Sequence, residues 1–458
     1  MSFIQVPPDS TGKKLFSHEH TVDGHQVHAQ VVHLGDHLNP DRIQVVDARG
    51  AASVRFSEGE PQFDAFGRIQ VSQMQSVGEY YHKGIDTPEK YWTKTIGSGT
   101  VTFQSQESVA LYSTSTDSGA RCQRTTNQYH PYKPGTSQLM YFSLVLGDTG
   151  KTNLLREWGY FDDFNGFGFR LQNNTLSVFL RSDISGTVVE EIVPQASWNL
   201  NTLDDPLLTE GVLHVDKANL YWMDMEWLGV GRVRLGVITP DGRRITVHEF
   251  RNGNSKSTLY MRSGTLPLRW NQQNLGTVAS TSEMRVSCGV VFTESSDIKY
   301  QGTLIHHSPD APIPITSSTE YVPFLSFRPK LTMGGVPNRI IGIHETFDWF
   351  ADGDAMHIGI FVNPTTLTGV SWSNTIVPSS MLQFDESATS MSQDGTLIES
   401  FIIGANSADR VNLGDRIEKS FGLPADGVTQ PVFVFAAKVL KSGGTSKIFY
   451  TKYWKEIR

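Results

Sequence analysis

An alternation of apolar and polar residues predicts two long β-strands in residues 221–251. Val233 and Leu235 alternate with Arg232 and Arg234, and the same period of two resumes after residue 244. Between the two runs lies the sequence PDG at residues 240–242. Pro presets φ, Asp hydrogen-bonds to its own backbone, and Gly accepts positive φ, so this segment predicts a tight turn. We take the resulting hairpin as the centre of the fold.

The strand before this hairpin has two chemically different faces. One face is wholly apolar and carries Tyr221, Met223, Met225 and Trp227. The other face carries two carboxylates among apolar residues: Leu220, Trp222, Asp224, Glu226 and Leu228. This side of the strand is where the question of enzyme or scaffold arises.

Short strands separated by turns are expected along the whole chain, and runs typical of long helices are few. The sequence therefore predicts an all-β protein of antiparallel jelly-roll or β-sandwich domains. We expect an extended N-terminal arm in residues 1–60, a lectin-like jelly roll in 61–294 and a second β-sandwich in 295–458. Within the arm, an Asp-Gly turn predicts a small hairpin over residues 21–27, and a second strand pair is expected at 44–47 and 52–56.

Length, charge and hydropathy narrow the class of protein. With 458 residues the chain is too long for one ordinary core. The net charge of −8 and the dispersed Lys and Arg residues argue against a nucleic-acid-binding or membrane surface. The N-terminus lacks a secretory signal, and no apolar run approaches the roughly 20 residues of a membrane-spanning helix. We expect synthesis in a cytoplasm and no membrane insertion.

The cysteines and histidines do not indicate a disulfide framework or a metal site. Cys122 and Cys288 are too few for a disulfide framework and are expected to be buried free thiols. Six histidines in the arm could hold zinc or nickel, but no paired spacing on a helix supports a metal cluster. We therefore expect surface histidines there: His18, His20, His25, His28, His33 and His37.

Asp224 and Glu226 are the strongest catalytic candidates in the sequence. Two residues apart on a strand, their carboxylates share a face at about 7 Å, a separation that glycoside hydrolysis can use. Jelly-roll glycosidases with the pattern Glu-x-Asp-x-Glu resemble this stretch, but Trp222 occupies the first acidic position. The favoured interpretation is that both acids form cross-strand ion pairs with Arg232 or Arg234.

Two acidic loops could bind calcium through carboxylate oxygens. One contains Asp162 and Asp163, and the other, at residues 348–354, contains Asp348, Asp352 and Asp354. Neither has EF-hand spacing, so backbone hydrogen bonding in turns is the favoured role. No nucleophile elbow or phosphate-binding loop occurs, and residues 229–231 (GVG) are interpreted as close packing within strands. We predict no catalytic residue, no cofactor and no metal.

Seven motifs are spread over most of the chain, at residues 8–14 (PDSTGKK), 62–68 (QFDAFGR), 132–138 (YKPGTSQ), 159–163 (GYFDD), 226–234 (EWLGVGRVR), 260–269 (YMRSGTLPLR) and 383–389 (QFDESAT). These motifs resemble a family of structural proteins from the virions of tailed bacteriophages. The resemblance implies a particle component, on the tail or the capsid exterior, without an enzymatic role. It also implies localisation in the virion after release by lysis.

Two functions are therefore weighed. The first is a non-enzymatic virion protein whose arm docks on capsid, neck or tail subunits, and which forms a homo-oligomer, with a trimer as our guess. The alternative is a carbohydrate-binding adhesin or glycan-degrading enzyme on a jelly roll, with a host surface glycan as its partner. Its stacking platforms would be Trp198, Trp222, Trp227 or Trp270, although aromatic residues at alternating strand positions are more often core.

Overall fold

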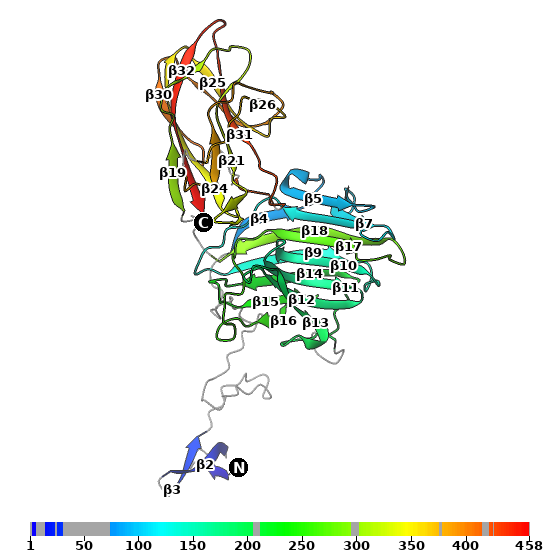
Figure 1. Ribbon diagram of the computed structural model, residues 1–458. Coiled ribbons are helices and arrows are strands. Elements are labelled where there is room, and N and C mark those ends of the chain that lie inside the picture. Colours follow the sequence, from blue (N-terminus) through cyan, green and yellow to red (C-terminus); the bar gives the residue numbers. More distant parts are fainter. Residues whose placement is uncertain are drawn as a thin grey trace. The chain divides into compact units, whose positions relative to one another are not determined.

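The chain divides into two compact units, residues 1–62 and 63–458. The computed structural model describes residues 2–5, 14–22, 25–30, 74–204, 211–294, 302–374, 378–414, 421–424 and 426–457. Within these ranges the only helical elements are two single 3₁₀ turns, η1 (Pro88–Lys90) and η2 (Gln195–Ser197). The prediction of an all-β, antiparallel jelly-roll or β-sandwich fold is confirmed, and Figure 1 shows the layered strands.

The N-terminal unit contains a small antiparallel sheet in the order β1 (Ser2–Gln5), β2 (Lys14–Val22) and β3 (His25–Gln30). The predicted hairpin is confirmed, because β2 pairs with β3 from Val22 and His25 outward. The expected strand pair at 44–47 and 52–56, together with His33 and His37, lies outside the described residues.

Two sheets surround the first apolar core of the larger unit. The seven-stranded sheet has the order β13 (Val189–Pro194), β12 (Thr175–Ser182), β11 (Gly166–Gln172), β10 (Leu154–Phe161), β17 (Leu268–Asn274), β8 (Arg121–Thr126), β5 (Tyr91–Ile96). The eight-stranded sheet comprises β16 (Arg244–Phe250), β15 (Val233–Ile238), β14 (Ala218–Met225), β9 (Gln138–Val145), β18 (Ser282–Thr293), β7 (Val109–Thr114) and β6 (Thr100–Gln104), with β4 (Gln75–Tyr81) paired to β18.

Aromatic rings from both sheets meet in this core. Trp158 of β10 is fully buried, and its ring centroid lies 5.8 Å from that of Phe169 and 4.9 Å from that of Tyr221 on β14. Met223 and Met225 follow Tyr221 into the same cluster, as the apolar face of that strand predicted. The two sheets therefore pack face to face, which is the sandwich geometry.

A second apolar core lies between two further sheets. One sheet contains β19 (Thr303–His307), β32 (Ser446–Ile457), β24 (Ile341–Gly353) and β30 (Ala408–Asn412), with β20 (Ile313–Ile315) paired to β32. The other contains β27 (Leu382–Asp385), β21 (Val322–Pro329), β31 (Phe433–Val439), β25 (Met356–Val362) and β29 (Thr396–Ile403). This part of the chain also contains two short antiparallel strand pairs: β22 (Thr332–Met333) with β23 (Val336–Pro337), and β26 (Leu367–Thr368) with β28 (Ser390–Met391).

The hairpin of β15 and β16 forms as predicted. Thr239 donates its amide hydrogen to the carbonyl of Arg243 at 2.9 Å, and Gly242 adopts φ +84° between them. The preceding segment, however, is a loop rather than a strand, so the interpretation of residues 229–231 as strand packing is wrong. Leu228 and Gly229 both have positive φ, and the amide of Gly231 donates to the carbonyl of Trp227 at 3.0 Å, which closes a turn.

His130 is a buried, neutral imidazole at the edge of the first core. Its Nδ1 lies 3.1 Å from the carbonyl of Leu266, which only accepts, so Nδ1 carries the hydrogen and Nε2 accepts from the Tyr80 hydroxyl at 3.0 Å. Burial lowers the pKa of His130 from 6.5 to about 4. The unfolded chain therefore binds a proton between these pH values that the folded chain does not.

We expect the free energy of unfolding to fall as the pH drops from 6.5 towards 4. At pH 5, His130 alone should reduce it by about 2 kcal/mol relative to pH 7. Urea unfolding of the wild type and of His130→Gln at both pH values measures this effect. The variant is expected to be less stable at pH 7 but to depend less on pH, and equal pH dependence in the two proteins would contradict the assignment.

Among the described residues, no helix has the length and apolar character needed to cross a lipid bilayer.

Candidate functional site

The outer face of the seven-stranded sheet is polar, while its inner face is apolar. On β10, Trp158 points into the core and Glu157 points outward, since neighbouring residues of a strand face opposite sides. The same alternation places Phe169 inward and Arg170 outward on β11. Period-two patterning in several strands thus gathers charged and amide side chains on one surface.

Strand register aligns these outward residues in a row across the sheet. Directly opposed positions on six neighbouring strands are Lys94, Gln123, Asn271, Glu157, Arg170 and Ser177. At roughly 4.8 Å per strand, the five steps between them span about 24 Å. A continuous line of hydrogen-bonding groups therefore runs across the sheet, perpendicular to its strands. Lys94 is partly exposed, and the other five side chains are at most 6% exposed.

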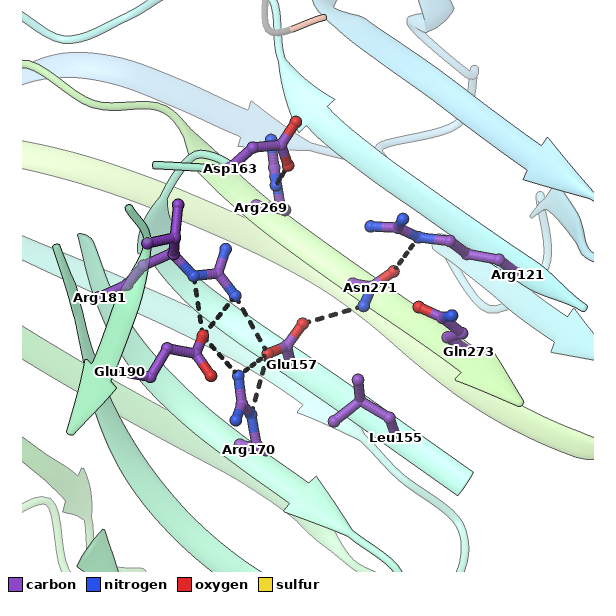
Figure 2. A pocket seen from close by; sticks show the side chains of 11 residues that line it. Arg121, Leu155, Glu157, Asp163, Arg170, Arg181, Glu190, Arg269, Asn271 and Gln273 are labelled. Carbon is purple, nitrogen blue, oxygen red and sulfur yellow. Dashed lines mark hydrogen bonds and ion pairs between the residues drawn. The ribbon is translucent and has the colours of Figure 1, made fainter. Parts of the chain in front are cut away.

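Two carboxylates and two guanidiniums form the centre of this surface. Nη2 of Arg170 lies 2.6 Å from Oε1 of Glu157 and 2.8 Å from Oε1 of Glu190. Arg181 lies 2.7 Å from Glu190 and 3.6 Å from Glu157. Figure 2 shows the four side chains converging from β10, β11, β12 and β13. Glu157 and Arg170 are almost fully buried, so the arrangement is rigid and little screened by solvent.

An amide extends this network to the next strands. Asn271 donates from Nδ2 to Oε2 of Glu157 at 3.0 Å, and its Oδ1 accepts from Nε of Arg121 at 2.8 Å. Arg121 in turn donates from Nη2 to the amide oxygen of Gln123. A connected chain of hydrogen bonds thus runs from β13 to β8 (Figure 2).

A third ion pair borders the same surface. Nη1 of Arg269 contacts Oδ1 of Asp163 at 2.5 Å, and its Nε donates to Thr125 at 3.0 Å. Burial acts to raise the pKa of Asp163, but the positive charge and hydrogen bond of Arg269 outweigh it and lower the pKa. Asp163 is therefore a fixed anion beside Arg269.

Two aromatic rings support the guanidiniums. The guanidinium carbon of Arg170 lies 4.8 Å from the ring centroid of Phe179, and those of Arg181 and Arg269 lie 5.0 and 5.3 Å from that of Phe161. These cation–π contacts hold the guanidinium planes in place.

The network surrounds an open depression of about 330 Å³. Its walls are the side chains of Arg121, Leu155, Glu157, Asp163, Arg170, Arg181, Val188, Glu190, Arg269, Asn271 and Gln273. Most of these groups are oriented by one another before any ligand arrives. This depression is our candidate functional site.

The two acids singled out in the sequence lie elsewhere, in the eight-stranded sheet. Asp224 is fully buried on β14 and pairs through both oxygens with Arg234 of β15, which confirms the predicted cross-strand ion pair. Glu226 is buried beyond the end of β14 and accepts from the hydroxyl of Tyr132 instead. Arg232 pairs with Glu249 at 3.5 Å. Neither acid borders the depression.

The tryptophans considered as stacking platforms are packed inside the protein. Trp198, Trp222 and Trp270 are each at most 5% exposed. Trp227 is partly buried against the first core and donates from Nε1 to the carbonyl of Met261 at 3.2 Å. The assignment of Trp198, Trp222 and Trp270 as sugar platforms is wrong, since a sugar ring needs an open aromatic face. For Trp227 it stays a prediction.

Of the two predicted acidic loops, only the one with Asp162 and Asp163 is a loop, because Asp348 and Asp352 lie within β24. Backbone hydrogen bonds and arginines hold most of the acidic side chains in both segments. Oδ1 of Asp162 accepts from the amides of Phe164 and Asn165, each at 2.8 Å. Asp348 pairs with Arg410 at 2.6 Å, and Asp354 accepts from the amide of Thr445 at 3.2 Å, while Asp352 is exposed. In the part of the chain that the structure describes, no three His, Cys, Asp or Glu side chains gather into a possible metal site.

Both cysteines are free thiols. Cys122 is buried, and burial raises its pKa to about 12. Cys288 is only partly buried and lies 3.1 Å from the hydroxyl of Ser143. The expectation of two buried thiols thus holds for Cys122 alone.

The depression was not predicted from the sequence, although the pattern of polar residues on its strands indicated a polar outer face. In residues 168–172, Arg170 and Gln172 alternate with the core residues Phe169 and Leu171, and in residues 269–273, Arg269 and Asn271 flank the core residue Trp270. A strand that is apolar on one side and rich in Arg, Asn, Gln and Glu on the other indicates an outer face selected for polar contacts.

No family model and no curated protein matches the sequence. Solved structures with a similar fold include a putative β-glucanase from Mycobacterium abscessus (TM-score 0.32, 12% identity), covering 47% of this chain and 100% of that one. A legume lectin-like domain from Entamoeba histolytica has a TM-score of 0.27 and 11% identity, covering 46% and 95%. Peanut lectin has a TM-score of 0.29 and 9% identity, covering 48% and 98%. Likenesses this distant bear on neither the site nor the function.

Proposed function

We propose that this chain is a non-enzymatic carbohydrate-binding protein that holds its ligand on the outer face of the seven-stranded sheet. The observation that carries the proposal is the row of donors and acceptors, aligned by strand register and fixed by ion pairs. Sugar hydroxyls donate and accept, so they match a surface on which guanidiniums, amides and carboxylates alternate. Jelly rolls are one of the folds on which lectin sites are built.

Binding without hydrolysis is supported by the lowered pKa of Glu190. Glu157 and Glu190 meet on one nitrogen of Arg170, close to the roughly 5 Å separation of acid pairs in retaining glycosidases. Such an enzyme needs one carboxyl with a raised pKa as general acid. Burial acts to raise the pKa of Glu190, but Arg181 and Arg170 outweigh it and lower the pKa. Glu190 therefore does not have the raised pKa that a general acid requires.

Binding is expected to weaken when an open wall of the depression is changed. Gln273 is partly buried and lines the depression, so Gln273→Trp should fill it and reduce affinity at least roughly ten-fold, about 1.4 kcal/mol. The measurement is binding to an array of acidic and neutral polysaccharides, repeated with the variant on every polysaccharide bound.

Gln104→Trp on β6 of the other sheet is the matched control, since Gln104 is also partly buried. It should bind as the wild type does. Failure of the wild-type protein to bind any polysaccharide would overturn the proposal. Release of reducing sugar from a bound polysaccharide would overturn its non-enzymatic part.

A second candidate is a structural subunit of a tailed-phage virion, and the two roles are compatible. The specific observation in its favour is the separate N-terminal unit with its own three-stranded sheet, as expected of a docking element. On this proposal, residues 1–62 attach to capsid, neck or tail subunits, and the β-domains face outward as a homo-oligomer. Mass spectrometry of purified particles tests it, and absence of this chain from them would end it.

A further inference from the structure

The depression has more positive than negative charge, although the chain as a whole is acidic. Four arginines face three carboxylates around it: Arg121, Arg170, Arg181 and Arg269 against Glu157, Asp163 and Glu190. The net charge of the chain is −8. A net positive charge at one site of an acidic protein favours binding of an anionic ligand at that site.

The excess charge can be assigned to Arg121. Arg170 and Arg181 pair with Glu157 and Glu190, and Arg269 pairs with Asp163. Within the described residues, by contrast, Arg121 has no carboxylate partner at ion-pair distance. Its acceptors there are the neutral amide oxygens of Asn271 and Gln123.

Arg121 also retains unused hydrogen-bonding capacity. A guanidinium has five N–H donors, and two of those of Arg121 have acceptors in the described part of the chain. Nε and one hydrogen of Nη2 hold the side chain in place, which leaves Nη1 and the second hydrogen of Nη2 for a ligand. These two nitrogens form the planar fork that pairs with a carboxylate through two parallel hydrogen bonds.

The surroundings favour such a contact. Arg121 is partly buried, so an ion pair there is less screened than one on an open surface. Burial and then the nearby charge of Arg269 lower the pKa of Arg121, and they outweigh the more distant carboxylates of Asp163 and Glu157, which raise it. Lys94 lies opposite Gln123 on β5 and adds a second positive charge at this end of the row.

We infer that the ligand is an acidic polysaccharide, and that the carboxylate of one of its sugar units pairs with the fork of Arg121 beside the polar row. This inference rests on the proposed function and adds the chemical class of the ligand. The hydroxyls of the same chain then meet the partly exposed polar side chains of the same depression, Arg181, Glu190 and Gln273.

The test compares each acidic polysaccharide with its own carboxyl-reduced form. Polygalacturonate, alginate, hyaluronate and polysialate are immobilised beside their reduced, neutral counterparts and beside dextran. We expect the full-length protein to bind at least one acidic polymer roughly ten-fold or more tightly than its reduced form. We also expect this preference to shrink at high salt, because Coulomb attraction is screened.

The variant Arg121→Gln should lose the preference while keeping residual binding to the reduced form. Arg251→Gln is the matched control. Arg251 is exposed in the other half of the sandwich, and its replacement by Gln removes the same charge. Far-ultraviolet circular dichroism and thermal unfolding verify that both variants fold, and Arg121→Lys retains charge without the fork and should fall between.

The outcomes separate the two proposals. Equal binding of acidic and reduced polymers, or an unchanged preference in Arg121→Gln, would overturn this inference and leave carbohydrate binding standing. Binding to none of the polymers, acidic or neutral, would overturn both.

Discussion

Replacing Trp158 by Ala is expected to destabilise the protein by about 4 kcal/mol, the largest loss that we predict for one residue. Trp158 is fully buried at the centre of β10, is opposed by Trp270 on β17, and packs on Phe169 and Tyr221. Removing the indole opens a cavity between the two sheets that the surrounding rings cannot fill. Urea unfolding followed by circular dichroism measures the loss.

Trp92→Ala is the matched control for this prediction. Trp92 lies on β5 of the same sheet but is only partly buried, so its removal should cost about 1 kcal/mol or less. A loss of less than about 2 kcal/mol for Trp158→Ala would show that the two sheets do not depend on this contact for their packing.

Removing Asp224 is expected to destabilise the protein by about 3 kcal/mol or more. Its carboxylate is 1% exposed and holds the guanidinium of Arg234, itself only 10% exposed, through two hydrogen bonds. Asp224→Ala deprives this nearly buried cation of its counter-charge. The free energy of unfolding from urea titration is again the measurement.

The double variant Asp224→Ala/Arg234→Leu provides the thermodynamic cycle. It should recover part of the lost stability, because no uncompensated charge remains. Polysaccharide binding by a folded Asp224→Asn variant should equal that of the wild type, since Asp224 belongs to the opposite sheet. Reduced binding by that variant would instead return Asp224 to the candidate site.

The fold was predictable where the local sequence indicates which residues are buried. Residues 240–242 specify their own turn. The predicted alternation breaks in β16 at a β-bulge, so that Val247 and Phe250 both pack in the first core. In β15, by contrast, Val233, Leu235 and Val237 face that core at alternate positions, as the sequence predicts. The same holds for Tyr221, Met223 and Met225 in the first core. A local signal of this kind needs no knowledge of which strands pair.

Edge strands and irregular loops were not predictable in this way. β13 has the sequence VEEIVP and β29 the sequence TLIESFII, and both lie at a sheet edge, where side chains on either face reach solvent and alternation fades. The loop at residues 227–232 resembles a strand in sequence, yet positive φ at Leu228 and Gly229 turns the chain there.

The candidate site depends on pairing between distant segments. Asn271 joins Arg121 to Glu157, residues separated from it by 150 and 114 positions. Asp224 and Glu226 drew attention because they are close in sequence, but such proximity does not decide which groups converge. Register among β8, β17 and β10 does, and it is a property of the whole sheet.

The pairing of β4 with β18 affects how the protein responds to proteolytic cleavage. β4 follows the N-terminal unit in sequence and covers one side of β18 from Cys288 to Thr293, while β9 covers the other side. Proteolytic loss of the segment up to Tyr81 would bare a ribbon of unpaired amides and carbonyls bearing Val290 and Phe292. Such an edge recruits strands from other molecules, so nicked protein would tend to aggregate before it unfolds.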